Sequence, residues 1–136
     1  MNVSRKCQYA LRAVFELARR EGQGPSRIAD VAEAQAIPAR FLEVILGQLK
    51  QGGFVASRRG AEGGYLLARE PSAISMGDII RFVDGPLVPV ACDEHDGHCP
   101  LGPGCVFQPV WERATEAVTE VFDATTMADL VERQRS

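Results

Sequence analysis

The sequence predicts a mainly α-helical protein with one small β-hairpin, a cysteine-rich loop and a long helix near its C-terminus. Three observations predict this class. Apolar residues recur at helical spacing up to residue 51 and again after residue 109, a glycine-rich turn separates two short strand-like segments between them, and the stretch 85–108 has no period. A chain of 136 residues is large enough for one compact core but too small for two independent ones.

Three helices are expected before the hairpin. The first covers residues 5–21, and Ser4 has the side chain of a helix cap. A short second helix over 27–37 is expected to begin at a cap formed by Ser26. The third covers residues 38–51, since proline is tolerated in a first turn and two glycines follow. The apolar stripe of this third helix comprises Leu42, Ile45, Leu46 and Leu49.

The outer face of the third helix carries small and polar residues that solve no packing problem. They are Ala39, Arg40, Glu43 and Lys50. We interpret them as free to contact a partner. The segments 54–58 and 65–67 flank a turn with several glycines, which predicts two strands and a hairpin with a basic tip.

Three short helices followed by a two-stranded hairpin are the order of a winged helix-turn-helix, in which the third helix enters the major groove of DNA. We expect Arg40 to face guanine and Glu43 to face a cytosine amino group. Arg58 and Arg59 are expected to probe the minor groove, while Gly60 lets the backbone approach a phosphate. The same fold also serves protein docking, so the order of elements alone leaves that alternative open.

The charge distribution favours DNA as the partner of the N-terminal half. Residues 1–69 hold eleven Lys and Arg against six Asp and Glu, whereas residues 70–136 hold four against twelve. The formal net charge of −3 is therefore the sum of a basic N-terminal module and an acidic C-terminal module. A basic module can meet phosphates, and the acidic module is expected to have another task.

The C-terminal half begins with a fourth helix, expected over residues 75–83. The segment 85–108 is rich in Pro, Gly and Cys, and a structureless stretch of this length usually signals a functional loop. Pro109 opens an amphipathic helix, and one more short helix is expected after Thr126. The stripe of the amphipathic helix comprises Val110, Ala114, Ala117, Val118, Val121 and Phe122.

Three cysteines in this loop are the sharpest chemical signal in the sequence. Cys92, Cys99 and Cys105 are separated by six and then five residues. Thiolates are preferred ligands of iron-sulfur clusters and zinc, and the intervening Gly and Pro residues let a loop bring several sulfurs to one centre. We therefore predict that these three thiols hold an iron-sulfur cluster.

Alternatives stay open for these thiols. Zinc is the cofactor if His95 or His98 completes a tetrahedral set with the three cysteines, although a solvated loop histidine is the ordinary reading of each. If the thiols hold no metal, they form a thiol switch. Cys7 stands apart on the first helix, where a small buried thiol is the ordinary explanation.

Several motifs resemble those of the Rrf2 family of bacterial winged-helix regulators. They are Tyr9-Ala10-Leu11-Arg12, Phe41-Leu42-Glu43, the wing Arg59-Gly60-x-x-Gly63-Gly64-Tyr65-Leu66-Leu67, and Cys105 followed closely by Trp111. The resemblance covers nearly the whole chain. It implies a cluster of the 2Fe-2S or 4Fe-4S type and a homodimer joined by the helix after the cysteines. It also implies control of genes for cluster assembly, iron supply or nitrosative stress.

The resemblance divides the chain into three regions: a winged helix-turn-helix DNA-binding domain (1–84), a cysteine-rich cluster-binding loop (85–108), and a dimerisation helix with a C-terminal tail (109–136). A two-fold dimer predicts a palindromic promoter site with half-sites about one helical turn apart. In this hypothesis the cluster senses iron, redox state or nitric oxide by fixing the spacing of two recognition helices.

The fourth cluster ligand departs from the family pattern. In members that control cluster assembly, a histidine follows the third cysteine by three residues, where this chain has Gln108. In nitric-oxide-sensing members, an acidic residue on the partner's first helix is the fourth ligand, and the matching position in this chain is Gln8. The first gap in the cysteine motif is also one residue longer. The candidates for the fourth ligand are therefore His95, His98, Gln8, Gln108 and solvent.

Two other classes of protein are less favoured by the sequence. The first is an electron-transfer or docking module that carries a cluster. Such a protein would not show the steeply salt-dependent DNA binding that is expected of a DNA-binding protein. An enzyme is disfavoured because the cysteines lie in an acidic loop, with no Ser-His-Asp arrangement or phosphate-binding loop. Without an export signal or a long apolar run, we expect a cytoplasmic protein that is away from the membrane and is not an enzyme.

Overall fold

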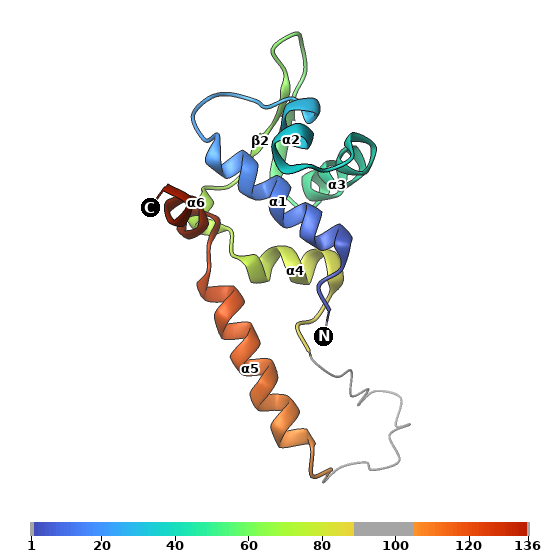
Figure 1. Ribbon diagram of the computed structural model, residues 1–136, viewed down its shortest axis with the longest axis vertical. Helices are drawn as coiled ribbons and strands as arrows, with labels where there is room; N and C mark the ends of the chain where they lie inside the picture. The colour runs from blue at the N-terminus through green and yellow to red at the C-terminus, as the bar shows by residue number, and fades with distance from the viewer. Residues whose placement is uncertain (1, 89–104, 136) are drawn as a thin grey trace.

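The computed structural model describes residues 2–88 and 105–135. In that part of the chain six α-helices, one short 3-10 turn and a two-stranded antiparallel sheet form (Figure 1). The elements are α1 (Arg5–Arg19), α2 (Ile28–Gln35), α3 (Ala39–Gln51), β1 (Val55–Arg58), β2 (Gly64–Leu67), η1 (Pro71–Ala73), α4 (Met76–Asp84), α5 (Gln108–Ala124) and α6 (Met127–Arg135). The predicted order of three helices, hairpin, fourth helix and long fifth helix is confirmed.

Helix α1 is the centre of the core, because α2, α3, α4, α6 and β2 all contact it. Its buried face is dominated by small and branched residues, which let the neighbouring helices pack closely. These are Ala10, Ala13, Val14, Leu17 and Ala18. The predicted stripe of α3 is buried against this face, with Leu42 and Leu46 fully covered. Helix α6 closes the core by returning to α1 through Met127 and Val131.

The predicted Ser26 cap is wrong. Helix α2 begins after Arg27 with no side-chain cap, whereas Ser26 pairs through its backbone with Tyr65 of β2. The Ser26 amide donates to the Tyr65 carbonyl, and the Tyr65 amide donates to the Ser26 carbonyl, each at 2.8 Å. The two hydrogen bonds fix the hairpin to the chain between α1 and α2. Ser26 therefore makes a tertiary contact through its backbone and does not cap a helix.

A buried carboxylate fixes the end of α2 against α1. Glu16 is 1% exposed and accepts hydrogen bonds from Arg19, Arg20 and Gln35. Burial alone would raise the pKa of Glu16, but these three donors outweigh it and lower the pKa to about 2. Arg12 adds hydrogen bonds to the last carbonyls of α2, at Gln35 and Ala36. The turn that leads into α3 is therefore held by α1.

We expect the Glu16 contacts to stabilise the fold above about pH 4.5, the ordinary value for an unfolded glutamate. Because the folded-state pKa is lowered, this contribution is fully present above that pH and is lost as the pH falls towards 2. Glu16→Gln should reduce the free energy of unfolding by about 2 kcal/mol at neutral pH. Urea unfolding between pH 2.5 and 7 measures this loss of unfolding free energy. The control is Glu21→Gln, since Glu21 is an exposed residue near Glu16. A constant difference between wild type and Glu16→Gln across that range would contradict the assignment.

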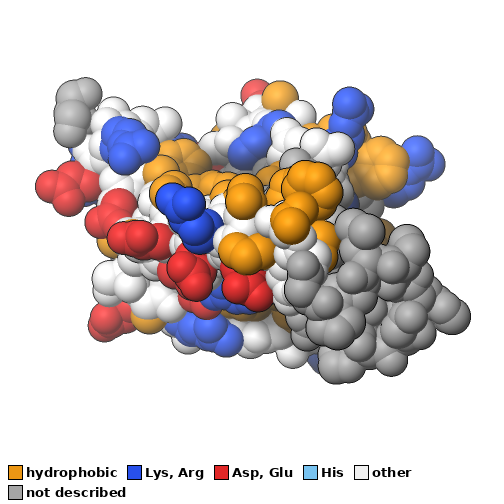
Figure 2. Space-filling view, turned by 90° about the horizontal axis from the view of Figure 1, so that it is seen from below, with side chains coloured by type: hydrophobic (Ala, Val, Ile, Leu, Met, Phe, Trp, Pro, Cys, Tyr) orange, Lys and Arg blue, Asp and Glu red, His pale blue; other side chains and the backbone are white. Residues whose placement is uncertain are grey.

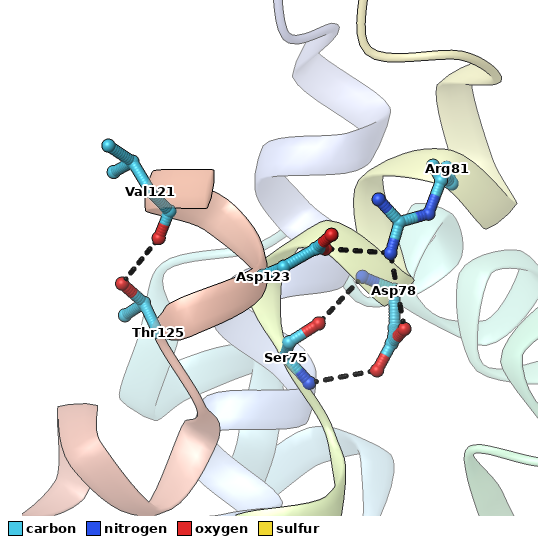
Figure 3. Close-up of polar contacts among 6 residues, drawn as sticks. All are labelled: Ser75, Asp78, Arg81, Val121, Asp123 and Thr125. Carbon is cyan, nitrogen blue, oxygen red and sulfur yellow. Dashed lines mark hydrogen bonds and ion pairs between the residues drawn. The ribbon is translucent and has the colours of Figure 1, made fainter. Parts of the chain in front are cut away.

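Helix α5 is attached to the domain mainly at its C-terminal end (Figure 1). Arg81 of α4 donates to Asp123 of α5 at 2.7 Å and also contacts Asp78 (Figure 3). Gly77 makes this approach possible, since a Cβ there would lie 1.9 Å from an Asp123 carboxylate oxygen. Ser75 and Asp78 form the capping box that begins α4. Away from this joint α5 projects from the body, and none of its side chains is buried.

Candidate nucleic-acid interface and cysteine segment

Helix α3 presents one face to the core and the opposite face to solvent. Its last turn is followed at once by the first strand, so helix and hairpin lie on the same part of the domain (Figure 1). Arg40 and Glu43, which the sequence predicts at base edges, are both exposed on the outer face. The guanidinium of Arg40 lies 5.9 Å from the ring centre of Phe41, a cation–π distance.

Lys50 departs from its prediction as a free residue of this face. Although its side chain is exposed, its ammonium donates to the Ser57 hydroxyl of β1 at 2.7 Å. The contact joins the end of α3 to the first strand of the hairpin. Lys50 therefore acts first as a structural link between the two elements.

The hairpin, or wing, carries its basic residues at the tip. Arg58 ends β1, and Arg59 and Gly60 follow in the turn, all exposed. Gly60 has a φ of +111°, a conformation that favours glycine. Arg27, just before α2, donates to the carbonyl of Ala61 at 2.7 Å and so holds the tip from the helical side. The fold thus brings two arginines and a close-approach glycine together at the outermost point of the wing.

Two residues of the outer face of α3 were absent from the sequence prediction. Phe41 is 53% exposed and Val44 is 57% exposed, although both are large and apolar. Because apolarity favours burial, the sequence pattern gives no direct sign that these side chains face solvent. Their spacing of three residues, out of phase with the buried stripe, is the signal that locates them.

The cysteine segment lies largely outside the described residues, and so do Cys92, Cys99 and both histidines. Cys105 is described: it is partly exposed, forms no disulfide within the described ranges, and lies three positions before the first residue of α5. No group of three metal-ligating side chains occurs within residues 2–88 and 105–135. Of the predicted cysteine site, the described residues therefore include only the C-terminal edge.

Cys7 is the buried thiol that the sequence predicts. It is fully covered by a small cluster with Ile80 and Leu87. Burial, with a contribution from the charge of Asp84, raises the pKa of Cys7 to about 12. Cys7 is thus a protonated core residue at neutral pH.

The start of α1 and the start of the cysteine segment are tied together. Ser4 donates to Asp84, the last residue of α4, through its amide at 2.8 Å and its hydroxyl at 2.5 Å. The side-chain amide of Gln8 donates to the Val3 carbonyl at 3.1 Å. Leu87, three residues beyond Asp84, is buried beneath α1. The chain therefore leaves the helical domain for the cysteine segment from a fixed point.

The N-terminal end of α5 carries an uncovered apolar surface. Figure 2 views the molecule from this end and shows hydrophobic side chains gathered in the middle, with acidic side chains along one border. Val106 and Phe107 directly precede the helix and Val110 lies in its first turn, and the three are between 54% and 79% exposed. Val121, near the other end of the helix, is 62% exposed and lies on the same face as Val110. Glu112, Glu116 and Glu120 lie on the opposite face. The predicted amphipathic stripe is present: Phe122 packs against the cluster of Cys7, Ile80 and Leu87, whereas Val110 and Val121 remain exposed in the described structure.

No helix in the described ranges is long and apolar enough to cross a membrane. Comparison with known proteins places the chain among transcriptional regulators. The family model Rrf2, described as an iron-dependent transcriptional regulator, matches residues 3–133. The regulator CymR of Bacillus subtilis is 38% identical over 130 residues, which is 96% of this chain and 89% of CymR. The regulator IscR of Yersinia enterocolitica is 34% identical over 134 residues, which is 98% of this chain and 81% of IscR.

The fold is shared with solved structures of the same regulators. CymR of B. subtilis, described as its global cysteine regulator, superposes with a TM-score of 0.83 at 37% identity, covering 98% of both chains. IscR of T. potens superposes with a TM-score of 0.81 at 36% identity, covering 98% of this chain and 88% of IscR. Family model, sequence relatives and fold agree over nearly the whole chain, which therefore belongs to the Rrf2 family of winged-helix transcriptional regulators.

Proposed function

We propose that this regulator binds palindromic promoter DNA as a homodimer and senses iron, redox state or nitric oxide through an iron-sulfur cluster. The observation that carries the DNA-binding part is the juxtaposition of α3 and the wing. Arg40 and Glu43 on the helix, with Arg58, Arg59 and Gly60 on the wing, are all exposed at the domain surface. The four charged side chains lie outside the buried core, whereas Gly60 is also favoured by the positive φ of the turn.

In this proposal each of the three regions of the chain has its own role. Residues 1–84 contact DNA, residues 85–108 hold the cluster, and residues 109–136 join the two subunits. In the major groove Arg40 donates to guanine and Glu43 accepts from the cytosine amino group. At the wing, Arg58 and Arg59 enter the minor groove and Gly60 lets the backbone approach a phosphate.

The donor set of the cysteine segment fits an iron-sulfur cluster. Cys92, Cys99 and Cys105 provide three soft thiolates from one segment, and Cys105 is partly exposed and unbridged within the described residues. When bound, such a cluster supplies a centre whose oxidation state follows the redox conditions. Zinc, with a histidine as fourth ligand, is the alternative occupant.

The signal reaches the DNA-binding domain through the ends of the cysteine segment. The segment starts at Asp84, which Ser4 of α1 holds, and ends at α5. Restraining the three thiols on one centre therefore restrains α5 relative to α1. Because α5 joins the subunits in this proposal, its direction sets the distance between the two α3 helices of a dimer.

Anaerobic purification tests the cluster. We expect visible absorption together with bound iron and sulfide, and loss of both in Cys105→Ala, whereas Cys7→Ala keeps them because Cys7 is a core thiol. DNA enriched from a random-sequence duplex pool should then bind the loaded and the metal-free protein with different affinity at fixed salt. Equal affinity would contradict sensing through the cluster, and a colourless zinc protein would contradict the choice of metal.

A thiol-responsive regulator is the second candidate, and one observation favours it. CymR, 38% identical to this chain, is described in its solved structure as a global cysteine regulator. In that case the same three cysteines act as thiols and not as metal ligands. Metal-free protein whose DNA affinity changes on oxidation and returns on reduction would support this candidate over the cluster.

A further inference from the structure

The outer face of α3 contains an apolar pair in the middle of polar residues. Phe41 and Val44 are more than half exposed, at 53% and 57%. With about 100° of rotation per residue, Val44 falls between Arg40 and Phe41 on the helix surface. In the described part of the chain, the other large exposed apolar side chains lie on α4, α5 or their flanking residues. The pair on α3 is thus separate from the apolar surface of α5.

Gly47 lies on the same face, one turn beyond Val44. Glycine inside a helix costs stability relative to alanine, so a packing reason is expected for it. None is found in the described structure, because no atom lies within 4 Å of the position that a Cβ would take. A surface outside the described residues that approaches the helix closely would account for a glycine here.

The charge around this face indicates which surface that is. Arg40 lies beside the apolar pair, and Arg58 and Arg59 extend from the neighbouring wing. An apolar protein partner would not require these exposed arginines, whereas DNA presents phosphate walls on either side of a groove. Within the major groove, the one apolar group on a base edge is the 5-methyl group of thymine.

We propose that Phe41 and Val44 contact thymine methyl groups in the major groove, so that the protein selects half-sites with thymine beside the base pairs read by Arg40 and Glu43. The proposal rests on the DNA binding proposed above. Two residues three apart on a helix are about 4.5 Å apart along its axis, against about 3.4 Å per base pair. The two side chains therefore reach neighbouring base pairs. Gly47 leaves room for α3 to lie deep enough for these contacts.

Replacement of thymine by deoxyuridine tests the proposal, since it removes the methyl group alone. Sites are first enriched from a random-sequence duplex pool with the full-length wild-type protein, and each thymine is then replaced in turn. We expect one or two positions per half-site at which uracil weakens binding by about fourfold, the effect of one buried methyl group. Uracil outside the half-sites should have no effect.

Variants connect the uracil effect to the two side chains. In Phe41→Ser and Val44→Ser the uracil and thymine duplexes should bind equally at the corresponding position. Both side chains are exposed, so the thermal midpoint should stay close to that of wild type. Arg58→Ala is the matched control: it should weaken both duplexes by the same factor and keep the uracil effect. Gly47→Ala should raise the thermal midpoint and weaken DNA binding.

The outcomes separate this proposal from the proposed function. If the pool yields enriched sites and Arg58→Ala weakens binding, but no uracil substitution has an effect, thymine reading is wrong while DNA binding stands. An equal uracil effect in wild type and in both serine variants also overturns it. If no sequence is enriched by the wild-type protein, the proposed function and the thymine contacts both fail.

Discussion

A Val110→Glu variant is expected to be monomeric and to bind a palindromic site at least about a hundredfold more weakly than wild type, because linking two half-site contacts raises affinity by a factor of about 10² to 10⁴. Val110 is 55% exposed in the first turn of α5, on its apolar face. A charge there would be desolvated in a helix pair without a partner of opposite sign. Sedimentation equilibrium and fluorescence anisotropy with an enriched duplex measure the two effects.

Thr119→Glu is the matched control for this variant. Thr119 lies about half a helical turn around from Val110, on the acidic side of α5, so the same substitution adds a charge away from the apolar face. It should remain dimeric and bind DNA like wild type. A dimeric Val110→Glu variant with unchanged affinity would show that the apolar face of α5 does not join the subunits.

A Gly64→Ala variant is expected to lose about 3 kcal/mol of unfolding free energy and to bind DNA at least about tenfold more weakly, because it breaks backbone hydrogen bonds and forces a strained φ. A Cβ at this position would lie 2.3 Å from the Ser26 carbonyl oxygen, and φ is +153°. The obstacle is the backbone of Ser26 and Arg27, so no side-chain rotation relieves it. The pairing of Ser26 with Tyr65 must open, which releases the wing from the helices.

The Gly22→Ala variant separates the effect of backbone strain from that of the steric clash at Gly64. Gly22 also has a positive φ, +88°, but nothing lies within 4 Å of a Cβ there. The control should cost about 1 kcal/mol through backbone strain alone and leave DNA affinity unchanged. Urea unfolding and anisotropy on both variants give the comparison. Equal losses of stability and affinity in the two variants would mean that the wing is not held through Ser26 and Tyr65.

The confirmed predictions depend on short-range interactions. Ser4 caps α1 through the amide of Cys7 as predicted, because a cap requires only residues two or three positions apart. The fourth helix, expected over 75–83, runs from Met76 to Asp84 with Ser75 as its cap. The buried stripe of α3 follows from the spacing of its leucines. For the same reason the exposed positions of Arg40 and Glu43 could be predicted before the structure was considered.

The failures have the opposite origin. Ser26 looks like a cap in the sequence, but a strand partner 39 positions away takes its backbone. Lys50 looks free, but Ser57 accepts its hydrogen bond across the junction between α3 and β1. In both cases the deciding contact depends on how a later strand of the hairpin packs.

The sequence by itself therefore determined the order of the elements, the amphipathic character of α5, the buried Cys7 and the family, all of which depend on periodicity, caps and motifs read along the chain. The cluster ligands stay predictions of the sequence, since Cys92 and Cys99 lie outside the described residues. Only the tertiary structure decided how the wing is fixed to α2, how Asp123 joins α5 to α4, and that an apolar pair with an open glycine faces outward on α3. The physical reason is that caps and periodicity involve neighbours in sequence, whereas exposure and close approach depend on elements that only folding brings together.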